Sequence, residues 1–410
     1  MATIVQKYGG TSVAGPDEIK RVAGRIVRTA DAGNAVCVVV SAMGHTTDEL
    51  LALAGKVSAD PDPRELDMLL TAGERMSMAL VSMAINDLGH QAVSFTGSQA
   101  GIVTDTRHGK ARIVEMRRGR VHQALAEGKI AIVAGFQGVS TSSDVTTLGR
   151  GGSDTTAVAL AAALEADSCE IYTDVDGVYT ADPRIVKDGR KLHQVSFEEM
   201  LELAACGARV LALRAVEYAR NHDVKLHVRS SFNETEGTWV MQEGDMLEQA
   251  IISGVAHDMA EAKVTIRRVP DRPGIAGHTF RPLADAGINI DMIVQNTSVD
   301  GLADISFTLP ENELDRALPL LDELARQIGA EGITSDPDIA KVSVIGAGMK
   351  TNPGVAATIF EALADEGINI DIISTSSIRV SCVVPREDAE RAVNVIHERL
   401  KLSDVFYEDA

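Results

Sequence analysis

Residues 272–291 read RPGIAGHTFRPLADAGINID, and residues 352–371 repeat this pattern without a gap as NPGVAATIFEALADEGINID. Each copy follows a short apolar run, 262–267 or 341–345, that is typical of a β-strand. In each copy the Pro-Gly pair predicts a turn that opens a helix. The repeat therefore predicts two structural units of the same kind.

The second half of each copy predicts how its unit continues. Gly287 and Gly367 predict left-handed C-caps where the first helices end, and we expect the next strand to begin with INID. A second helix is expected over 313–328 in the first unit and over 387–400 in the second. The order βαββαβ describes a ferredoxin-like unit.

Upstream of the repeats, strand-like and helix-like segments alternate. Apolar runs predict buried strands at 4–7, 35–41, 130–134, 170–173 and 224–230, and helical periodicity predicts helices at 19–30, 65–88, 112–127 and 155–166. This alternation predicts an α/β fold, a three-layer αβα domain with a mainly parallel sheet. We expect this domain over residues 1–245 and the two ferredoxin-like units over 262–337 and 338–410.

Composition narrows the class of protein. The 410 residues are 45% hydrophobic and 24% charged, which is typical of a soluble globular chain with more than one domain. A net charge of -20 argues against a nucleic-acid partner, because phosphate backbones need clustered Lys and Arg. The four cysteines lack metal-ligand spacing, and the N-terminus lacks a signal-peptide pattern. We expect a cytoplasmic protein with no metal-ligand cluster and no membrane partner.

The first polar motif, KYGGTS, spans residues 7–12 directly after the first predicted strand. Glycines there would let backbone N–H groups approach phosphate oxygens, and Lys7 would supply a positive charge. An ordinary strand-to-helix turn is the alternative. The sequence contains no Walker A pattern, which excludes a P-loop fold.

The second motif, TTLGRGGSDTT, spans residues 146–156 and leads into an Ala-rich helix. A Gly-rich loop at a helix N-terminus is a good anion site. Ser153 and Asp154 could instead be simple N-caps. Arg150 is harder to explain that way, because its guanidinium offers a fork suited to a carboxylate or a phosphate.

Further polar residues follow other predicted strands. The motif YTDVDGVYTADPR, residues 172–184, could hold an adenine ring, a ribose or Mg²⁺, although turn chemistry could also explain it. Ser41 and Thr47 lie at and beyond the end of the second strand. Glu74 lies at or near a helix start, where helix-dipole stabilisation is the alternative to a binding role.

Together these motifs resemble the aspartate kinase branch of the amino acid kinase family, with tandem ACT-type repeats. The matching segments are KYGGTSV, VVSAMG, LLTAGER, SFTGSQAGI, TTLGRGGSD and TDVDGVYTADPR, in this order along nearly the whole chain. The resemblance implies transfer of the ATP γ-phosphoryl group, with Mg²⁺, to the β-carboxylate of L-aspartate. It also implies that a strand within 251–258 completes the second ACT unit.

The resemblance assigns roles to residues of the first domain. Lys7 would stabilise the transferring phosphoryl group, Asp154 would organise the site around it, and Ser41 would lie between nucleotide and amino acid. The nucleotide would contact Lys7, Gly9, Gly10, Ser41, Thr173, Asp174, Tyr179, Arg184 and Arg209. Aspartate would contact Ser41, Thr47, Glu74, Phe136, Arg150, Gly151, Gly152 and Ser153.

For the ACT-type repeats the resemblance implies inhibition by lysine and threonine and at least a homodimer. The effector residues would be Asp271, Asn289, Ile290, Asp291, Gln295, Asn369 and Ile370. A short regulatory subunit could start at Met241 or Met246. Two positions depart from the family pattern: Arg209 stands where relatives carry Lys, and Ser377 where they carry Glu.

Two other functions are weighed against this one. The first is an amino acid kinase acting on glutamate, acetylglutamate, carbamate or UMP, against which the ACT-type repeats and the LTAGER segment speak. The second is a non-catalytic amino-acid sensor, which the joint presence of Lys7, Arg150 and Asp154 disfavours.

Overall fold

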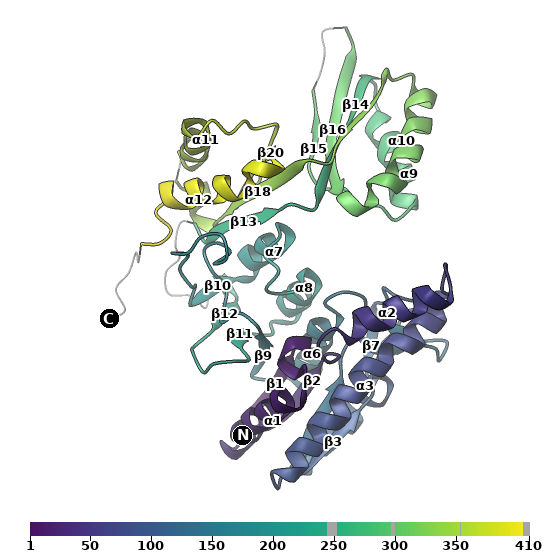
Figure 1. Cartoon of the computed structure of the whole chain (residues 1–410), viewed down its shortest axis with the longest axis vertical. Helices are drawn as coiled ribbons and strands as arrows, with labels where there is room; N and C mark the ends of the chain where they lie inside the picture. The colour runs from purple at the N-terminus through teal and green to yellow at the C-terminus, as the bar shows by residue number, and fades with distance from the viewer. Residues whose placement is uncertain (244–251, 297–299, 353, 405–410) are drawn as a thin grey trace. The chain divides into compact units, whose positions relative to one another are not determined.

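The structure, a computed structural model, describes residues 1–243, 252–296, 300–352 and 354–404 (Figure 1). These residues form two compact units. Unit 1 contains Met1–Val178, Lys191–Ala205 and the segment that starts at Arg209. Unit 2 contains Tyr179–Arg190, Cys206–Ala208 and the described residues from 252 onward.

The main sheet of unit 1 has the strand order β10-β12-β11-β9-β1-β2-β6-β3. Its strands are β1 (Thr3–Tyr8), β2 (Ala35–Val40), β3 (Ala92–Phe95), β6 (Ile130–Ala134), β9 (Ser168–Thr173), β10 (Gln194–Ser196), β11 (Leu226–Ser230) and β12 (Thr238–Met241). Neighbouring strands are parallel except for the pair of β11 and β12. The predicted mainly parallel sheet is confirmed.

Unit 1 has helices on both faces of this sheet. The helices of this unit are α1 (Pro16–Asp31), α2 (Thr46–Val57), α3 (Pro63–Asp87), α4 (Gly97–Ala100), α5 (Gly119–Ala126), α6 (Gly152–Leu164), α7 (Phe197–Ala205) and α8 (Leu213–His222), with the 3₁₀ turn η1 (Gly10–Val13). Helix α2 packs on the outside of α3. The alternate residues Val36, Val38 and Val40 pack with α1 and α3 in one core cluster. Helix α6 packs against β1, β2 and β9, and α8 packs on α6. Strands buried on both faces explain why their sequences are continuously apolar.

A smaller sheet in unit 1 corrects one prediction. Its order is β5-β4-β7-β8, formed by β4 (Ile102–Thr104), β5 (Ile113–Met116), β7 (Gln137–Ser140) and β8 (Val145–Thr147). The predicted helix over 112–127 is wrong in its first half, because Ile113–Met116 pairs with β4 as a strand. Strand pairing with a distant segment overrides local helix propensity here. Only α5 is helical.

Unit 2 contains two four-stranded antiparallel sheets. The first, β15-β16-β14-β17, consists of β14 (Glu261–Pro270), β15 (Ile293–Gln295), β16 (Leu302–Pro310) and β17 (Gly332–Asp336). The second, β13-β18-β20-β19, consists of β13 (Gly254–Asp258), β18 (Ile339–Ile345), β19 (Ile372–Thr375) and β20 (Arg379–Pro385). Strand β13 lies within the expected range 251–258 and pairs with β18.

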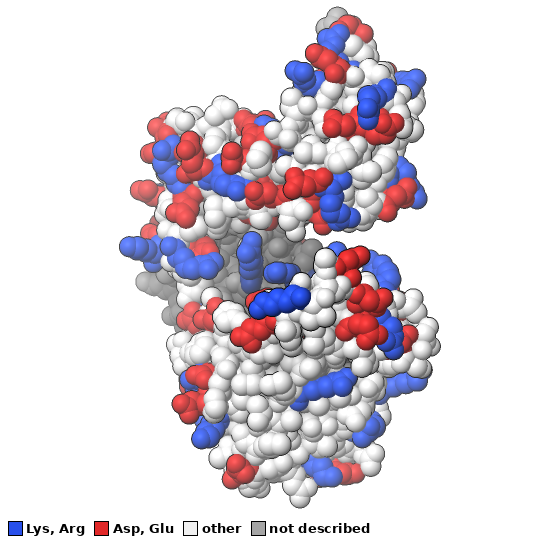
Figure 2. All heavy atoms as spheres, turned by 45° about the vertical axis from the view of Figure 1, so that its right-hand side comes forward, with Lys and Arg blue, Asp and Glu red and all other residues white. Residues whose placement is uncertain are grey.

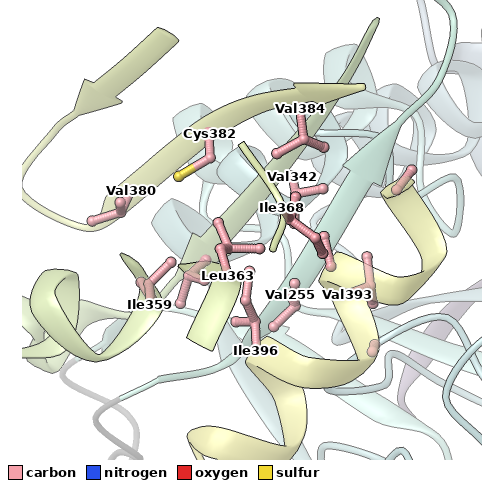
Figure 3. Close-up of a cluster of buried hydrophobic side chains, with 14 of the residues drawn as sticks. Val255, Val342, Ile359, Leu363, Ile368, Val380, Cys382, Val384, Val393 and Ile396 are labelled. Atoms are coloured by element: carbon pink, nitrogen blue, oxygen red, sulfur yellow. The ribbon is translucent and has the colours of Figure 1, made fainter. Parts of the chain in front are cut away.

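Each sheet of unit 2 carries two helices on one face, as Figure 1 shows. They are α9 (Ile275–Asp285) and α10 (Leu314–Ile328) on the first sheet, and α11 (Val355–Asp365) and α12 (Ala389–Arg399) on the second, with the 3₁₀ turns η3 (Glu311–Glu313), η4 (Ala347–Lys350) and η5 (Arg386–Asp388). The core of the second sheet is aliphatic, with Val342, Leu363 and Ile396 among its side chains (Figure 3). The predicted ferredoxin-like architecture is confirmed.

The glycines of the repeat have the predicted roles at the helix ends. Gly274 and Gly354 are N-caps with φ of 90° and 108°, and Gly287 and Gly367 follow the helices with φ of 71° and 69°. Positive φ is inexpensive only for glycine. The expectation that a strand begins with INID is wrong, because β15 and β19 begin only after it. The INID segments are connecting loops.

Helix α3 is unusual in unit 1 for its length and apolar composition. It is the one helix among the described residues that is long and apolar enough to cross a membrane by those two criteria. Half of its most apolar 18-residue window is buried inside the unit. Its buried side packs on α1 and on the sheet.

Candidate active site

Lys7 lies near the carboxyl end of the central strand β1, between β2 and β9. Its Nζ is 2.6 Å from Oδ1 of Asp154, which lies in the first turn of α6. Each side chain is 12% exposed, so the pair can be reached from outside. The structure therefore joins the two predicted catalytic residues directly.

The loop after β1 can accept only glycine at its closest approach. A Cβ on Gly10 would lie 2.9 Å from the carbonyl oxygen of Ala42, and the Gly44 N–H donates to the Gly10 carbonyl at 3.0 Å. A Cβ on Gly9 would lie 3.6 Å from Nζ of Lys7. Gly9 keeps a side chain away from the lysine and Gly10 allows the close approach of the loop after β2, an arrangement suited to phosphate oxygens.

Helix α6 begins at the same edge of the sheet. Its N-cap is Gly151, with φ of 70°, so the alternative that Ser153 or Asp154 is the N-cap is excluded. A Cβ on Gly152 would lie 2.9 Å from the Phe136 ring, which fixes the helix start against that residue. The first N–H groups of a helix and its dipole favour an anion there.

Phe136 itself has an unusual backbone. Its φ of 66° is rare for a bulky residue, and it lies between β6 and β7, directly before Gln137. Its carbonyl accepts a hydrogen bond from the Leu148 N–H at 2.9 Å, which holds the conformation. Non-glycine residues with a strained left-handed backbone conformation cluster at functional sites. This geometry supports the prediction that Phe136 shapes a substrate pocket.

Glu74 lies in the middle of α3, which corrects the expectation of a helix start. Burial raises its pKa from 4.5 to about 7, and backbone hydrogen bonds at Glu74 and Ala42 oppose this shift more weakly. Its Oε2 is buried and accepts no hydrogen bond. Helix-dipole stabilisation does not explain a buried carboxylate in mid-helix. The free oxygen is instead suited to a ligand cation.

Ala42 connects Glu74 to the lysine loop. Its carbonyl oxygen meets Gly10, and its Cβ would lie only 2.7 Å from a Cβ on Gly73. The loop after β2 therefore packs against both Gly10 and the helix that carries Glu74. A buried carboxylate and a lysine are thereby assembled around one loop.

The other predicted residues of unit 1 lie at strand ends, in loops or in first turns of helices. Ser41 follows β2, and its N–H donates to the Tyr8 carbonyl at 3.1 Å. Thr47 is in the first turn of α2, and Arg150 is exposed beside α6. The rest are Thr173, which ends β9 and donates to Asp174 at 3.0 Å, Asp174, and Arg209, which is exposed between α7 and α8.

Two predicted nucleotide residues belong to the other unit. Tyr179 and Arg184 lie in Tyr179–Arg190, which packs within unit 2. Arg184 pairs there with Asp182. Their contact with a nucleotide stays a prediction from the resemblance.

The predicted effector residues all lie in unit 2. Asp271 follows β14, and Gln295 ends β15. Asn289, Ile290 and Asp291 form the loop before β15, and Asn369 and Ile370 occupy the equivalent loop before β19. Ser377 lies in the turn between β19 and β20.

Lysines at equivalent repeat positions link these loops across the two sheets. Lys341 of β18 pairs with Asp291 and lies 3.3 Å from Glu261, while Lys263 of β14 pairs with Asp371. Each sheet thus sends one lysine to the INID aspartate of the other. Burial lowers the pKa of Lys341, but Glu261 and Asp291 outweigh it and hold that pKa above its usual range.

Asp67 is a structural residue of the site that the sequence interpretation missed. It is buried, accepts from Thr147 Oγ1, pairs with His108 Nδ1 at 2.8 Å, and accepts from the Gly109 N–H at 3.1 Å. It thereby fixes the end of β8, from which the loop leads to Arg150. A helical period could have found it, because Asp67 lies seven residues before Glu74 on α3.

The site fits a nucleoside triphosphate by the shape of its backbone. A Cβ on Gly10 would clash with the Ala42 carbonyl oxygen, the Cβ position of Gly9 lies 3.6 Å from Lys7 Nζ, and Lys7 supplies positive charge there. Among the described residues no cluster of three or more acidic, His or Cys side chains could hold a metal ion. Mg²⁺ at nucleotide sites usually binds through one or two carboxylates together with the phosphates, so its binding would not require such a cluster.

Comparisons with known proteins agree with this geometry. Residues 2–230 match the model of the amino acid kinase family, and residues 264–329 and 342–400 match two ACT domain models. The chain is 59% identical to an aspartokinase from Mycolicibacterium smegmatis, over 98% of this chain and 97% of that protein.

Solved structures of the same kind are also similar. Escherichia coli aspartokinase III in complex with aspartate and ADP (R-state) has a TM-score of 0.85 at 27% identity, covering 97% of this chain and 100% of that one. The same enzyme in complex with lysine and aspartate (T-state) has a TM-score of 0.75 at 27% identity, covering 97% and 99%.

Proposed function

The chain belongs to the amino acid kinase family and is one of its aspartate kinases, and from this premise we propose which of its residues carry the reaction. The enzyme phosphorylates L-aspartate to 4-phospho-L-aspartate, the first step towards lysine, threonine, methionine and isoleucine. ATP is the proposed phosphoryl donor, and Mg²⁺ its proposed companion ion. When bound, the ion would neutralise charge on the phosphate oxygens.

Lys7 is proposed to face the phosphoryl group during its transfer. A carboxylate is already a nucleophile at neutral pH, so the reaction needs no general base. Catalysis reduces to alignment, charge neutralisation and exclusion of water. The observation that carries this proposal is the Lys7–Asp154 pair beside the N-terminus of α6, because it supplies an oriented positive charge where anions gather.

Aspartate is proposed to bind between α3, α6 and the loop after β2. Glu74 would attract its ammonium group with the unpartnered Oε2, and Arg150 would bind a carboxylate. The remaining proposed contacts to aspartate are Ser41, Thr47, Phe136, Gly151, Gly152 and Ser153. Those to ATP are Gly9, Gly10, Ser41, Thr173, Asp174, Tyr179, Arg184 and Arg209.

Regulation is proposed to act through the two ACT units, with lysine and threonine as effectors. The proposed contacts are Asp271, Asn289, Ile290, Asp291, Gln295, Asn369 and Ile370. Asp291 is paired with Lys341, so an amino-acid effector that binds this loop would compete with that ammonium group for the carboxylate. The structure of Escherichia coli aspartokinase III with lysine supports lysine as one effector.

The chain is also proposed to form at least a homodimer and to be located in the cytoplasm. The edge strands β15 and β19 expose Ile293 and Ile373 at equivalent repeat positions, which supports at least a homodimer through the ACT units. A short regulatory subunit would start at Met241 in β12 or at Met246, which lies outside the described residues. A cytoplasmic location fits both the enzyme class and the four buried free cysteines.

The test is hydroxamate formation with purified protein, ATP, Mg²⁺ and hydroxylamine, comparing L-aspartate with L-glutamate and adding lysine, threonine or both. We expect product from aspartate and a joint reduction by the two effectors. Activity unaffected by either effector would overturn the regulatory assignment alone. Loss of product in Lys7→Ala, with Lys20→Ala on the surface of α1 as control, tests the role of Lys7.

A further inference from the structure

The loop between β8 and α6 carries Arg150, and its first residue, Leu148, is fixed through both of its backbone groups. The Leu148 N–H donates to the Phe136 carbonyl at 2.9 Å. The Leu148 carbonyl accepts a hydrogen bond from Nη1 of Arg214 at 3.1 Å. The chain turns directly afterwards at Gly149, which has a φ of 78°. Arg214 therefore holds the chain at the residue where the turn towards Arg150 begins.

The guanidinium of Arg214 also binds a second segment. Its Nη2 donates to the Ala111 carbonyl at 3.0 Å, and the Ala111 N–H donates to the Thr147 carbonyl at 2.9 Å. Ala111 and Leu148 are both buried, so a carbonyl that lost Arg214 would lose its partner away from water. A planar fork of donors suits two carbonyl oxygens on neighbouring segments, whereas a lysine ammonium is a single point. Arg214 thus bridges the end of β8 to the segment beside it.

Asp67 and Arg214 hold the same two segments by opposite chemistry. Asp67 of α3 accepts from Thr147 Oγ1 and from the Gly109 N–H. Arg214 of α8 donates to the carbonyl of the residue after Thr147 and to that of the second residue after Gly109. The anion binds donors of both segments, and the cation binds acceptors of both. The start of the Arg150 loop is therefore fixed by two charged side chains from two helices.

Helix α8 begins directly against this loop. Its N-cap is Ala212, and a Cβ on Gly151, the N-cap of α6, would lie only 2.3 Å from the Ala212 Cβ. Helices α6 and α8 also pack on each other. The backbone of Arg214, two residues after Ala212, is therefore fixed relative to the loop that its side chain binds.

The position of Arg214 is unfavourable for a cation on electrostatic grounds. It lies in the first turn of α8, where the helix dipole opposes a positive charge and where residues 213–216 include no acidic side chain. Burial lowers the pKa of Arg214, and the neighbouring Arg112 lowers it further. In Figure 2, blue Lys and Arg side chains lie beside red Asp and Glu side chains at many points of the surface, whereas both described hydrogen bonds of Arg214 end on carbonyl oxygens. This cation therefore depends on the two carbonyls for its stabilisation.

We propose that Arg214 is a positioning residue for the aspartate-binding loop, because it bridges two backbone carbonyls and thereby holds Arg150 where it can bind a substrate carboxylate. The inference rests on the proposed binding of aspartate by Arg150. Arg214 acts on aspartate only through the loop. Its loss should therefore raise KM for aspartate much more than KM for ATP.

The first test compares the kinetics of Arg214→Met and Arg220→Met in the hydroxamate assay. Arg220 is a matched control, because it is the same residue type in the last turn of the same helix. Arg214→Met should raise KM for aspartate about tenfold, as for a lost hydrogen bond to a charged group, and KM for ATP less than about twofold. Arg220→Met should leave both constants unchanged. An unchanged KM for aspartate in Arg214→Met, or an equal rise for both substrates, would overturn the proposal.

A double variant shows whether Arg214 acts through Arg150. Arg150→Met alone should raise KM for aspartate more than Arg214→Met does, and the two changes combined should be no worse than Arg150→Met alone. Additive effects would contradict the proposal, because Arg214 would then act on aspartate by another route. An effect of Arg150→Met without one of Arg214→Met would remove this inference alone. An unaltered KM in Arg150→Met would remove the proposed binding by Arg150 and this inference with it.

Arg214→Lys separates the geometry of the side chain from its charge and from loss of folding. It keeps the positive charge and the apolar stem, but its ammonium can hold one carbonyl and not bridge two. We expect a melting temperature close to that of the unaltered chain, with KM for aspartate between those of the unaltered chain and Arg214→Met. Full recovery of KM by lysine would show that charge alone suffices and would exclude the bridging role. This variant also carries the test where Arg214→Met fails to fold.

Discussion

Lys7 in unit 1 and Lys341 in unit 2 both pair with an aspartate, but the two lysines differ in what remains for a ligand. Lys7 faces one carboxylate, is 12% exposed and adjoins a glycine-lined loop. Lys341 faces Asp291 and Glu261 and is 2% exposed. A lysine with one accessible partner can still neutralise a phosphate, whereas a buried lysine between two carboxylates has its charge already balanced. The first arrangement suits catalysis and the second suits holding two sheets together.

The largest effect should come from removing Lys7, and it should fall on kcat. Lys7→Ala should lower kcat about 10³-fold, because a preorganised positive charge at the transferring group is lost. The melting temperature should also fall, because Asp154 is only 12% exposed and loses its cation. The measurement is kcat by the hydroxamate assay beside the melting temperature. A variant within tenfold of the unaltered enzyme would contradict the role of Lys7.

The next largest effect should come from replacing Lys341 in unit 2. Lys341→Met should lower the free energy of unfolding of unit 2 by about 3 kcal/mol, because Glu261 and Asp291 are left without their cation. The measurement is urea unfolding followed by a probe in unit 2, with kcat recorded without effectors as a check on unit 1. Unchanged unfolding would show that the pair does not hold the two sheets.

The raised pKa of Glu74 predicts that aspartate binding in unit 1 depends on pH. Only its ionised form attracts the ammonium of aspartate, so KM for aspartate should fall as pH rises through about 7. Glu74→Gln should raise KM about tenfold at pH 8 and remove this dependence. An unaltered enzyme with a flat KM between pH 6 and 8 would contradict the assignment.

Glu74 also predicts a pH dependence of stability. Its pKa is higher in the folded than in the unfolded chain, so its contribution is full below about pH 4.5 and declines as pH rises to about 7. Glu74→Gln should therefore be more stable than the unaltered protein at pH 8, and the difference should shrink towards pH 5. Melting temperatures of the two proteins across this range provide the measurement.

The smallest effect should come from the second cross-repeat pair. Lys263 occupies the repeat position of Lys341, but it is 22% exposed and lies nearer to solvent. Lys263→Met should cost less than about 1 kcal/mol, as for an exposed ion pair. A cost equal to that of Lys341→Met would show that burial does not distinguish the two pairs. Urea unfolding of both variants side by side decides between these outcomes.

Much of the fold follows from local patterns. Buried parallel strands require continuous apolar runs, and left-handed helix ends favour glycine, so β1, β2, β6 and the ends of α9 and α11 could be predicted. The strand Ile113–Met116 could not, because its conformation depends on pairing with β4. The INID segments were predicted as strand starts for a related reason. Hydrogen bonding to the neighbouring strand decides where an edge strand such as β15 or β19 begins.

The sequence by itself determined the family, the reaction and the residues that stand at the strand ends, because these depend on short motifs and on a repeat without a gap. Only the tertiary structure decided which charges meet: Lys7 with Asp154, Lys341 with Asp291, and Asp67 with the loop before Arg150. It also decided that Arg214 meets the carbonyls of Ala111 and Leu148. Contacts between residues far apart in the chain depend on packing and burial, which no local pattern specifies.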